Sequence, residues 1–317
     1  MTTVKRYDPQ AAARREHGAA AQFRRFVQRH GWSYAFVLPS LITFALFTLI
    51  PVLWSFVISF QRFSLARGGR WQDPLWENYA DAFSKQGGVF VTAIQNTLIY
   101  SFFTVTANIL FGLILASLIQ PLSNRLKTVF RAAYYLPAVT SALIVGMTWR
   151  YIFNAQWGFA NYLLRLVGLE PIRWLSDPNI ALTSVTLSAV LTMPATAVVL
   201  FSAAMGSIPA EYYEAAELDG AGPITRWWRI TVPLIRSTTL YLVVLYTIAS
   251  FEVFERVYAM VPSGVGNSTQ TIVTQIYNNG FKDLDFGVAS AQAFILFVMI
   301  AVLAVVQFRA LQSDVEY

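Results

Sequence analysis

Residues 207–233 read SIPAEYYEAAELDGAGPITRWWRITVP, a polar segment that lies between two long apolar runs. Pro209 and Glu211 mark the start of a helix, because proline fits the first helical turn and a carboxylate is stabilised by the positive end of the helix dipole. Gly220 ends that helix, and Pro223 can begin a second one. The segment therefore predicts two short helices joined by a turn.

The runs on either side of this segment, and those farther along the chain, are too apolar for a soluble protein. Of the 317 residues, 56% are hydrophobic and 13% are charged, whereas ordinary globular chains carry about 25% charged residues. The mean hydropathy is +0.50. This composition excludes an intrinsically disordered chain and a nucleic-acid-binding protein. The sequence predicts a membrane protein.

Six uncharged runs approach or exceed the length that a membrane helix needs. A hydrocarbon core of about 30 Å requires roughly 20 apolar residues in helical form. The fifth run is the weakest, because only fifteen uncharged residues separate Arg236 from Glu252. We therefore expect an all-α, polytopic protein with six transmembrane helices, within residues 33–60, 89–124, 134–153, 178–209, 236–252 and 286–308.

Positive charges predict the orientation of these helices, because Lys and Arg collect on the cytoplasmic side of a membrane. The basic arm at residues 1–32 is expected to stay in the cytoplasm, and an even number of crossings returns the tail at residues 311–317 to the same side. The transmembrane domain then covers residues 33–310, and residues 207–233 form a cytoplasmic helix-turn-helix between helices four and five. The basic residues of the arm are Lys5, Arg6, Arg14, Arg15, Arg24, Arg25 and Arg29.

The chain lacks the residues that most enzymes and metal sites need. It contains no cysteine, and its two histidines, His17 and His30, both lie in the basic arm. None of its four lysines follows a glycine, so the phosphate-binding sequence G-x-x-x-x-G-K-[ST] does not occur. We expect no metal site, no catalytic residue and no ATP hydrolysis on this chain.

The order of residues in segment 207–233 resembles the EAA loop of binding-protein-dependent ABC importer permeases. The pattern is Glu-Ala-Ala, three residues, Gly, nine residues and then Ile-x-Val-Pro, where the family usually has leucine in place of Val232. Parts of residues 131–154 and 267–291 are similar to the carbohydrate-type members, which include maltose and glycerol-phosphate transporters. An amphipathic loop that rests on lipid headgroups is the alternative that composition allows. The matching residues are Glu214, Ala215, Ala216, Gly220, Ile230 and Pro233.

The resemblance implies one subunit of a larger importer in the prokaryotic inner membrane. Residues 207–233 would be the coupling loop on which a dimer of ATPase subunits docks, and those subunits would bind ATP and Mg. Glu214 would pair with the ATPase surface, and Gly220 would supply the bend between the two helices. The other implied partners are a second, homologous permease subunit that forms a heterodimer, an extracytoplasmic solute-binding protein, the small-molecule solute and membrane lipid, but no nucleic acid. The chain itself would need no cofactor.

The resemblance also implies where the solute passes, namely along the helix before the loop and along the fifth helix. Hydroxyl groups, an aromatic ring and a carboxylate at these positions suit a polyhydroxylated solute such as a sugar, because rings cover sugar C–H faces and polar groups bind hydroxyls. The positions implied for the path are Ser188, Leu191, Thr192, Ala195, Ser250, Phe251 and Glu252.

Glu252 and Glu255 are expected to share one face of the fifth helix, with Arg256 adjacent. Two interpretations stand: the carboxylates contact the solute, or they form a structural cluster with Arg256 at the outer membrane surface. A carboxylate at Glu252 argues against an anionic solute, so a permease for glycerol-3-phosphate or a glycerophosphodiester is the alternative, with Arg150, Arg256 or the partner permease supplying a cation. A gradient-driven secondary transporter is less favoured, because the two halves of the sequence do not mirror each other.

Overall fold

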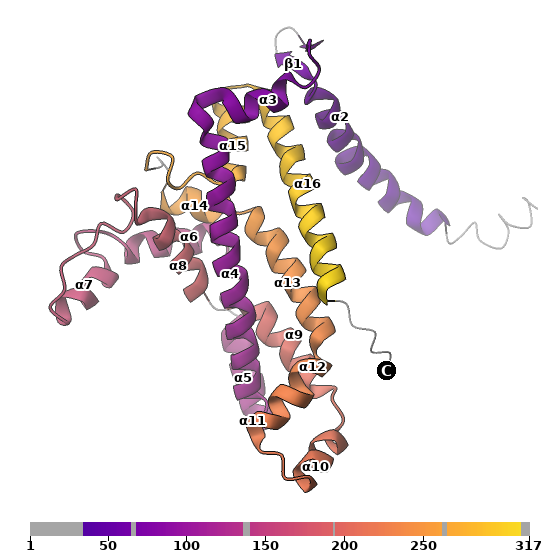
Figure 1. The fold of residues 1–317 in the computed structure, drawn as a ribbon, viewed down its shortest axis with the longest axis vertical. Helices are drawn as coiled ribbons and strands as arrows, with labels where there is room; N and C mark the ends of the chain where they lie inside the picture. The colour runs from indigo at the N-terminus through magenta and orange to yellow at the C-terminus, as the bar shows by residue number, and fades with distance from the viewer. Residues whose placement is uncertain (1–33, 65–67, 136–139, 193, 262–264, 312–317) are drawn as a thin grey trace, which may run out of the picture. The chain divides into compact units, whose positions relative to one another are not determined.

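Helices make up most of the protein, as the all-α prediction requires (Figure 1). The computed structural model describes residues 34–64, 68–135, 140–192, 194–261 and 265–311. The predicted basic arm and all but the first residue of the predicted tail lie outside these ranges. The chain divides into two compact units, Met1–Val57 and Ile58–Tyr317, and each is described by itself.

The described part of the first unit belongs to one apolar helix, which runs from Tyr34 to Ile58 at the unit boundary. A π-helical turn, Ala45–Leu49, interrupts it directly before α2, Ile50–Ile58. Pro51 explains the wider turn, because proline has no N–H to donate and its ring crowds the carbonyl group of the preceding turn. The helix is long and apolar enough to cross a membrane, as predicted for residues 33–60.

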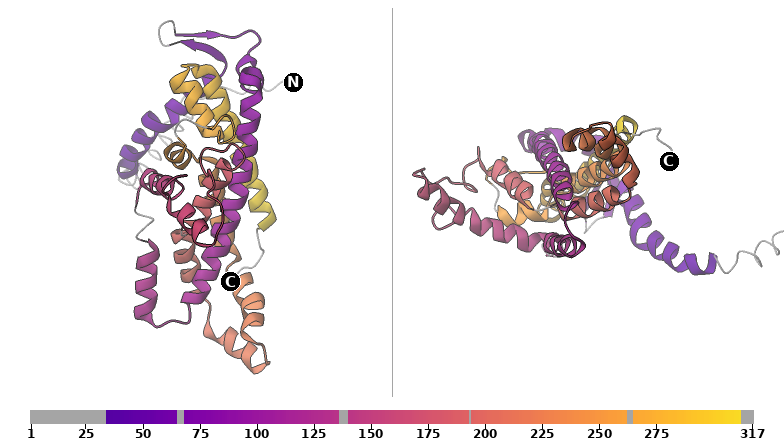
Figure 2. Two further views of the ribbon diagram at one scale, coloured as in Figure 1. Left: turned by 90° about the vertical axis from the view of Figure 1, so that its left-hand side faces the viewer. Right: turned by 90° about the horizontal axis from the view of Figure 1, so that it is seen from below.

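The second unit is built around the long helix α4, which packs against α8, α9 and α13, while α13 packs against α16 (Figures 1 and 2). Short irregular turns flank some helices: a 3-10 turn at Lys85–Gly88 and π-helical turns at Trp227–Thr231 and Asn278–Lys282. The helices are α3 Glu77–Ser84, α4 Val89–Ile119, α5 Asn124–Tyr135, α6 Ala142–Ile152, α7 Phe159–Leu166, α8 Ala181–Leu191, α9 Ala195–Gly206, α10 Ala210–Leu218, α11 Pro223–Arg226, α12 Val232–Leu234, α13 Arg236–Phe251, α14 Glu255–Met260, α15 Ile272–Tyr277 and α16 Phe286–Leu311.

Within the described residues, four helices are long and apolar enough to cross a membrane, or five if a bent pair is counted as one span. The three in the second unit are Val89–Ile119, Ala181–Gly206 and Phe286–Ala310, and the bent pair joins Pro223–Leu234 to Arg236–Phe251. Together with Tyr34–Ile58, these three helices and the bent pair overlap five of the six predicted transmembrane helices. In the remaining one, at residues 134–153, the structure describes the eleven-residue α6, whereas residues 136–139 lie outside the described part.

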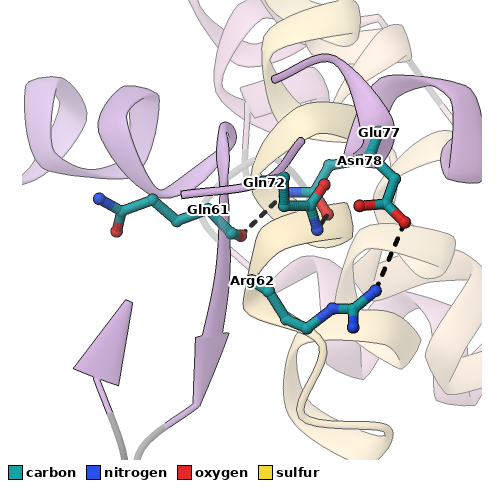
Figure 3. Close-up of polar contacts among 5 residues, drawn as sticks. All are labelled: Gln61, Arg62, Gln72, Glu77 and Asn78. Atoms are coloured by element: carbon teal, nitrogen blue, oxygen red, sulfur yellow. Dashed lines mark hydrogen bonds and ion pairs between the residues drawn. The ribbon is translucent and has the colours of Figure 1, made fainter. Parts of the chain in front are cut away.

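A small antiparallel hairpin, β1 Gln61–Ser64 with β2 Gly68–Trp71, is the part of the described fold that the all-α prediction omits. Asn78 of α3 holds it: its amide donates to the carbonyl oxygen of Gln61 and accepts from Gln72, both at 2.9 Å (Figure 3). The same amide also donates to the carbonyl oxygen of Ser59 at 2.9 Å. Asn78 is buried, so these bonds satisfy polar groups that water does not reach. An ion pair between Arg62 and Glu77, at 3.4 Å, adds a second contact.

One apolar core of the second unit joins α4, α9 and the start of α13. Its buried members are Ala116, Ala197, Phe201, Met205, Ile235 and Leu242. Gly112 of α4 allows the close approach, because a Cβ atom at this position would collide with the Cβ atom of Ala197 in α9. The loop 207–233 connects two of the helices that this core holds together.

Candidate functional site

The loop 207–233 folds as the two short helices that the sequence predicts. The helix α10 ends in a left-handed residue, Gly220, with φ +79°. The N–H of Gly220 bonds the carbonyl oxygen of Glu217 at 3.0 Å, and that of Ala221 bonds Ala216 at 2.9 Å. These two bonds are the glycine-based helix ending known as the Schellman motif. The next helix begins at Pro223, again as predicted.

Polar contacts tie the loop to itself and to α4. The hydroxyl groups of Tyr213 and Thr231 lie 2.9 Å apart, so the two helices of the loop are linked near their bases. The indole N–H of Trp227 donates to Ser117 of α4 at 2.8 Å. A cavity of about 350 Å³ lies where the loop meets α4, and its lining includes Trp227 and Ser117. The loop is therefore attached to the bundle through α4.

The predicted coupling residues lie mostly on the outside of this loop. Glu214, Ala215, Gly220 and Pro233 are exposed, whereas Ala216 and Ile230 are half-buried. Figures 1 and 2 show α10 and α11 at one end of the second unit. The exposed carboxylate of Glu214 is therefore accessible to another protein.

The same tip carries exposed apolar side chains, of which Leu218 and Ile224 are not among the predicted coupling residues. Leu218 is 90% exposed, Ile224 is 76% exposed and Trp228 is 60% exposed. Contiguous exposed apolar surface marks interaction sites in soluble parts of proteins. The sequence does not single them out, because the same segment holds other large apolar residues, among them Ile208, Trp227 and Ile230, that are not exposed.

A bend joins the loop to α13. The axes of Pro223–Leu234 and Arg236–Phe251 differ by 66° across the break at Ile235. Ile235 itself is 1% exposed and belongs to the apolar core described above. Pro233 lies two residues before this break, and the far end of α13 leads to a second candidate site.

That second site is a cavity of about 220 Å³ between α4, α8, α9, α13 and α14, here called the hydroxyl-lined cavity. Tyr100 and Thr192 both lie eleven residues after the first residue of their helices, α4 and α8. At 1.5 Å per residue the cavity is about 16 Å from those helix starts, well inside the apolar runs. Its lining residues are Tyr100, Thr104, Asn108, Ala189, Thr192, Pro194, Ala195, Thr196, Tyr246, Ala249, Ser250 and Arg256.

The structure brings together some of the residues predicted for the solute path and separates others. Thr192, Ala195 and Ser250 line the hydroxyl-lined cavity. Ser188 is buried beside it and contacts Arg256, a lining residue. The other three lie elsewhere: Leu191 is exposed, Phe251 is 2% exposed within an apolar core, and Glu252 is exposed and not among the lining residues.

The expectation that Glu252 and Glu255 share one helical face is wrong. The helix α13 ends at Phe251, and α14 starts only at Glu255, after Phe254 with φ −134° and ψ −60°. A continuous helix would place the N–H of Val257 on the carbonyl oxygen of Val253. Instead, the hydroxyl group of Thr271 donates to that oxygen at 3.0 Å. A partner from a distant part of the chain thus stabilises the break.

Arg256 is the functional candidate that this break creates. Its Nη1 atom donates to the hydroxyl oxygens of Thr192 at 3.3 Å and Ser188 at 3.4 Å. The buried phenol group of Tyr100 lies next to the guanidinium group and interacts with it electrostatically. The sequence did contain a signal, because Arg256 is the only basic residue between Arg236 and Lys282. The direction in which the Arg256 side chain points depends on the break between α13 and α14, and the spacing of residues in the sequence did not reveal that break.

Comparison with known proteins identifies the family. The model of the family described as binding-protein-dependent transport system inner membrane component matches residues 108–315. The chain belongs to this family. The matching region contains the loop 207–233 and the helices α8, α9, α13 and α14 of the hydroxyl-lined cavity.

Individual relatives are similar over most of their length. The chain is 28% identical to the arabinooligosaccharides transport system permease protein AraP of Bacillus subtilis, over 90% of each chain. It is 32% identical to the sn-glycerol-3-phosphate transport system permease protein UgpA of Agrobacterium fabrum, over 72% of this chain and 78% of UgpA. A chain of a bacterial ABC transporter involved in the import of the acidic polysaccharide alginate matches with a TM-score of 0.80 at 23% identity, covering 93% of this chain and all of that one. At that identity the likeness shows a shared fold.

The protein is therefore an inner-membrane permease subunit of a carbohydrate-type ABC importer. Subunits of this kind are not enzymes, because a separate ATPase hydrolyses the ATP. Family membership also excludes the gradient-driven secondary transporter. Among the described residues, no three His, Cys, Asp or Glu side chains are grouped so that they could hold a metal ion.

Proposed function

We propose that this chain pairs with a second, homologous permease subunit to carry a sugar or a related polyhydroxylated solute, delivered by an extracytoplasmic binding protein. The complete chain would have six transmembrane helices with both termini in the cytoplasm. A dimer of ATPase subunits, which bind ATP and Mg, would drive the transport from the cytoplasmic side. The names of AraP and UgpA, an oligosaccharide permease and a glycerol-3-phosphate permease, support a solute of this class.

One observation carries the proposal: a single helix, α13, joins the loop to the wall of the hydroxyl-lined cavity. The loop ends in the bend at Ile235, and α13 continues to Ser250 in the cavity wall. A partner that moves the loop can therefore act on the wall through α13, as in other transitions in which packed elements shift as rigid bodies. Residues 207–233 are then the coupling loop, with Glu214 pairing with the ATPase and Gly220 providing the bend.

The chemistry of the cavity supports a polyhydroxylated solute. Its wall presents the hydroxyl groups of Thr104, Thr196, Tyr246 and Ser250 and the side-chain amide of Asn108. The hydroxyl groups of Thr104 and Ser250 donate their protons to the carbonyl oxygens of Tyr100 and Thr247, so they offer lone pairs that accept hydrogen bonds from the hydroxyl groups of a solute. The side-chain amide of Asn108 can both donate and accept. The partner permease would close the remaining side.

A permease for glycerol-3-phosphate or a glycerophosphodiester is the second candidate. The carboxylate of Glu252 argued against it from the sequence, but Glu252 is not among the residues that line the cavity. The similarity to UgpA supports this candidate directly.

The test is Glu214→Arg in the complete importer, reconstituted in proteoliposomes with its binding protein. We expect uptake to be lost and the ATPase to dissociate more readily. The reason is that a cation would replace the exposed carboxylate that pairs with the ATPase surface. Glu170→Arg, the same charge change at an exposed residue outside the loop, is the matched control and should keep the ATPase bound. Normal uptake and normal ATPase binding by Glu214→Arg would contradict the coupling role.

A further inference from the structure

The hydroxyl-lined cavity has one charged side chain among its lining residues, and that side chain is a cation. The other residues of the lining contribute hydroxyl, amide and apolar groups around Arg256. Charges placed deep within membrane-spanning segments are costly and normally face a cavity, a partner or a transported ion. A charge at this position therefore indicates that Arg256 has a function.

The hydroxyl groups beside Arg256 are oriented in advance. Thr192 donates its proton to the carbonyl oxygen of Ser188 at 2.7 Å, and Ser188 donates its own to Val185 at 2.6 Å. Each hydroxyl group has a single proton, so both oxygens present only lone pairs to the guanidinium group. The indole N–H of Trp149 also donates to Thr192, at 3.3 Å, and helps to hold it.

These contacts hold Arg256 without neutralising it. The bonds to Thr192 and Ser188 use Nη1 and neutral oxygen atoms at 3.3–3.4 Å, and the phenol group of Tyr100 is also neutral. The guanidinium group has five N–H donors, so donors are left for further partners. Within the described residues, the ion pairs are Arg62 with Glu77 and Arg226 with Glu217, and neither involves Arg256. Its neighbours in sequence, Glu252 and Glu255, are both exposed.

The contact between α6 and α14 places Arg256 at the cavity. A Cβ atom on Gly146 of α6 would lie 2.7 Å from the Cβ atom of Ala259 and 3.5 Å from the Cα atom of Arg256. Only glycine lets α14 approach this closely. The backbone is thus built to bring the guanidinium group to the wall rather than to leave it in solvent.

We propose that Arg256 binds an anionic group of the transported solute, so that the substrate class is an anionic polyhydroxylated compound such as a sugar acid or a polyol phosphate. The guanidinium group presents several N–H donors in one plane, which matches the oxygen atoms of carboxylate and phosphate. The hydroxyl groups of Thr196 and Ser250 would bind the uncharged part of the same solute. This inference rests on the proposed function of the cavity as the solute path.

The experiment uses the complete importer in proteoliposomes and measures uptake of matched pairs of solutes. The pairs are glycerol-3-phosphate with glycerol, and oligogalacturonate with the corresponding neutral galacto-oligosaccharide. We expect the wild-type importer to carry an anionic member and not its neutral counterpart. Arg256→Gln should lower kcat/KM for that solute about tenfold to a hundredfold, as loss of a charge-assisted hydrogen bond predicts, and Arg256→Lys should retain part of the activity.

Controls separate binding from folding and from the proposed function. Arg173→Gln, at an exposed residue outside the cavity, should transport normally. The variants must also assemble with the ATPase, so that loss of uptake cannot reflect loss of the complex. Uptake of a neutral sugar by the wild-type importer, or normal uptake of the anionic solute by Arg256→Gln, would overturn this inference while the proposed function stands. Failure of the wild-type chain to assemble with any ATPase would overturn the proposed function as well.

Discussion

At the scale of single residues, a few side chains decide where helices stop, and hence where the two candidate sites form. Gly220 takes the left-handed conformation that ends α10, and the hydroxyl group of Thr271 takes the carbonyl oxygen that a continuous helix would have used after α13. The first of these choices is local, because glycine alone adopts φ +79° without strain. The second depends on a residue eighteen positions away.

Gly220→Ala tests the local choice. A Cβ atom at φ +79° is strained by about 1–2 kcal/mol in an L residue, so the turn between α10 and α11 should loosen and coupled uptake should fall several-fold. Solute uptake and ATP hydrolysis are both measured in proteoliposomes, and their ratio gives the coupling. Gly222→Ala is the matched control, because Gly222 has φ −70° and open space around the Cβ position. Equal effects of the two substitutions would show that the left-handed turn has no special role.

At the scale of elements, the sequence predicted what local signals control. The apolar runs located the candidate membrane helices, and Gly220 with Pro223 located the two helices of the loop. The hairpin was missed, because its strands are short and its stability comes from Asn78 on a later helix. The solute path was predicted in part, since Thr192 and Ser250 reach the cavity but Arg256 could be placed there only once the break at 252–254 was known.

The contact between α6 and α14 gives a prediction for a pair of elements. Gly146→Ala should push α14 away, since the new Cβ atom would lie 2.7 Å from that of Ala259, and displace Arg256 from the cavity. We expect lower thermal stability of the complex and weaker solute uptake. Ala259→Gly removes the opposing atom, so the double variant should regain most of both properties. A double variant no better than Gly146→Ala alone would contradict this account of the contact.

At the scale of the whole molecule, the second unit connects a site for a partner protein with a site for a solute. The loop is fixed to α4 by the bond from Trp227 to Ser117, and the core around Ile235 holds the start of α13. The cavity wall, in contrast, takes Tyr246 and Ser250 from the other end of α13. If α4 and the loop move together, then opening the cavity requires a change in the 66° angle between the loop helix and α13.

This mechanism predicts a distance change across the bend during the transport cycle. The chain has no cysteine, so a pair introduced for spin labels will be the only cysteines on this subunit. We expect the label distance between positions 224 on α11 and 241 on α13, both exposed in the structure, to change when the assembled importer binds ATP. Positions 98 and 118, both exposed on α4, are the control pair, and their separation of about 30 Å along one helix should stay constant. A constant distance across the bend, in an importer that still hydrolyses ATP and transports, would show that the loop and α13 move as one rigid lever, and the opening of the cavity would then have to arise between this chain and its partner permease.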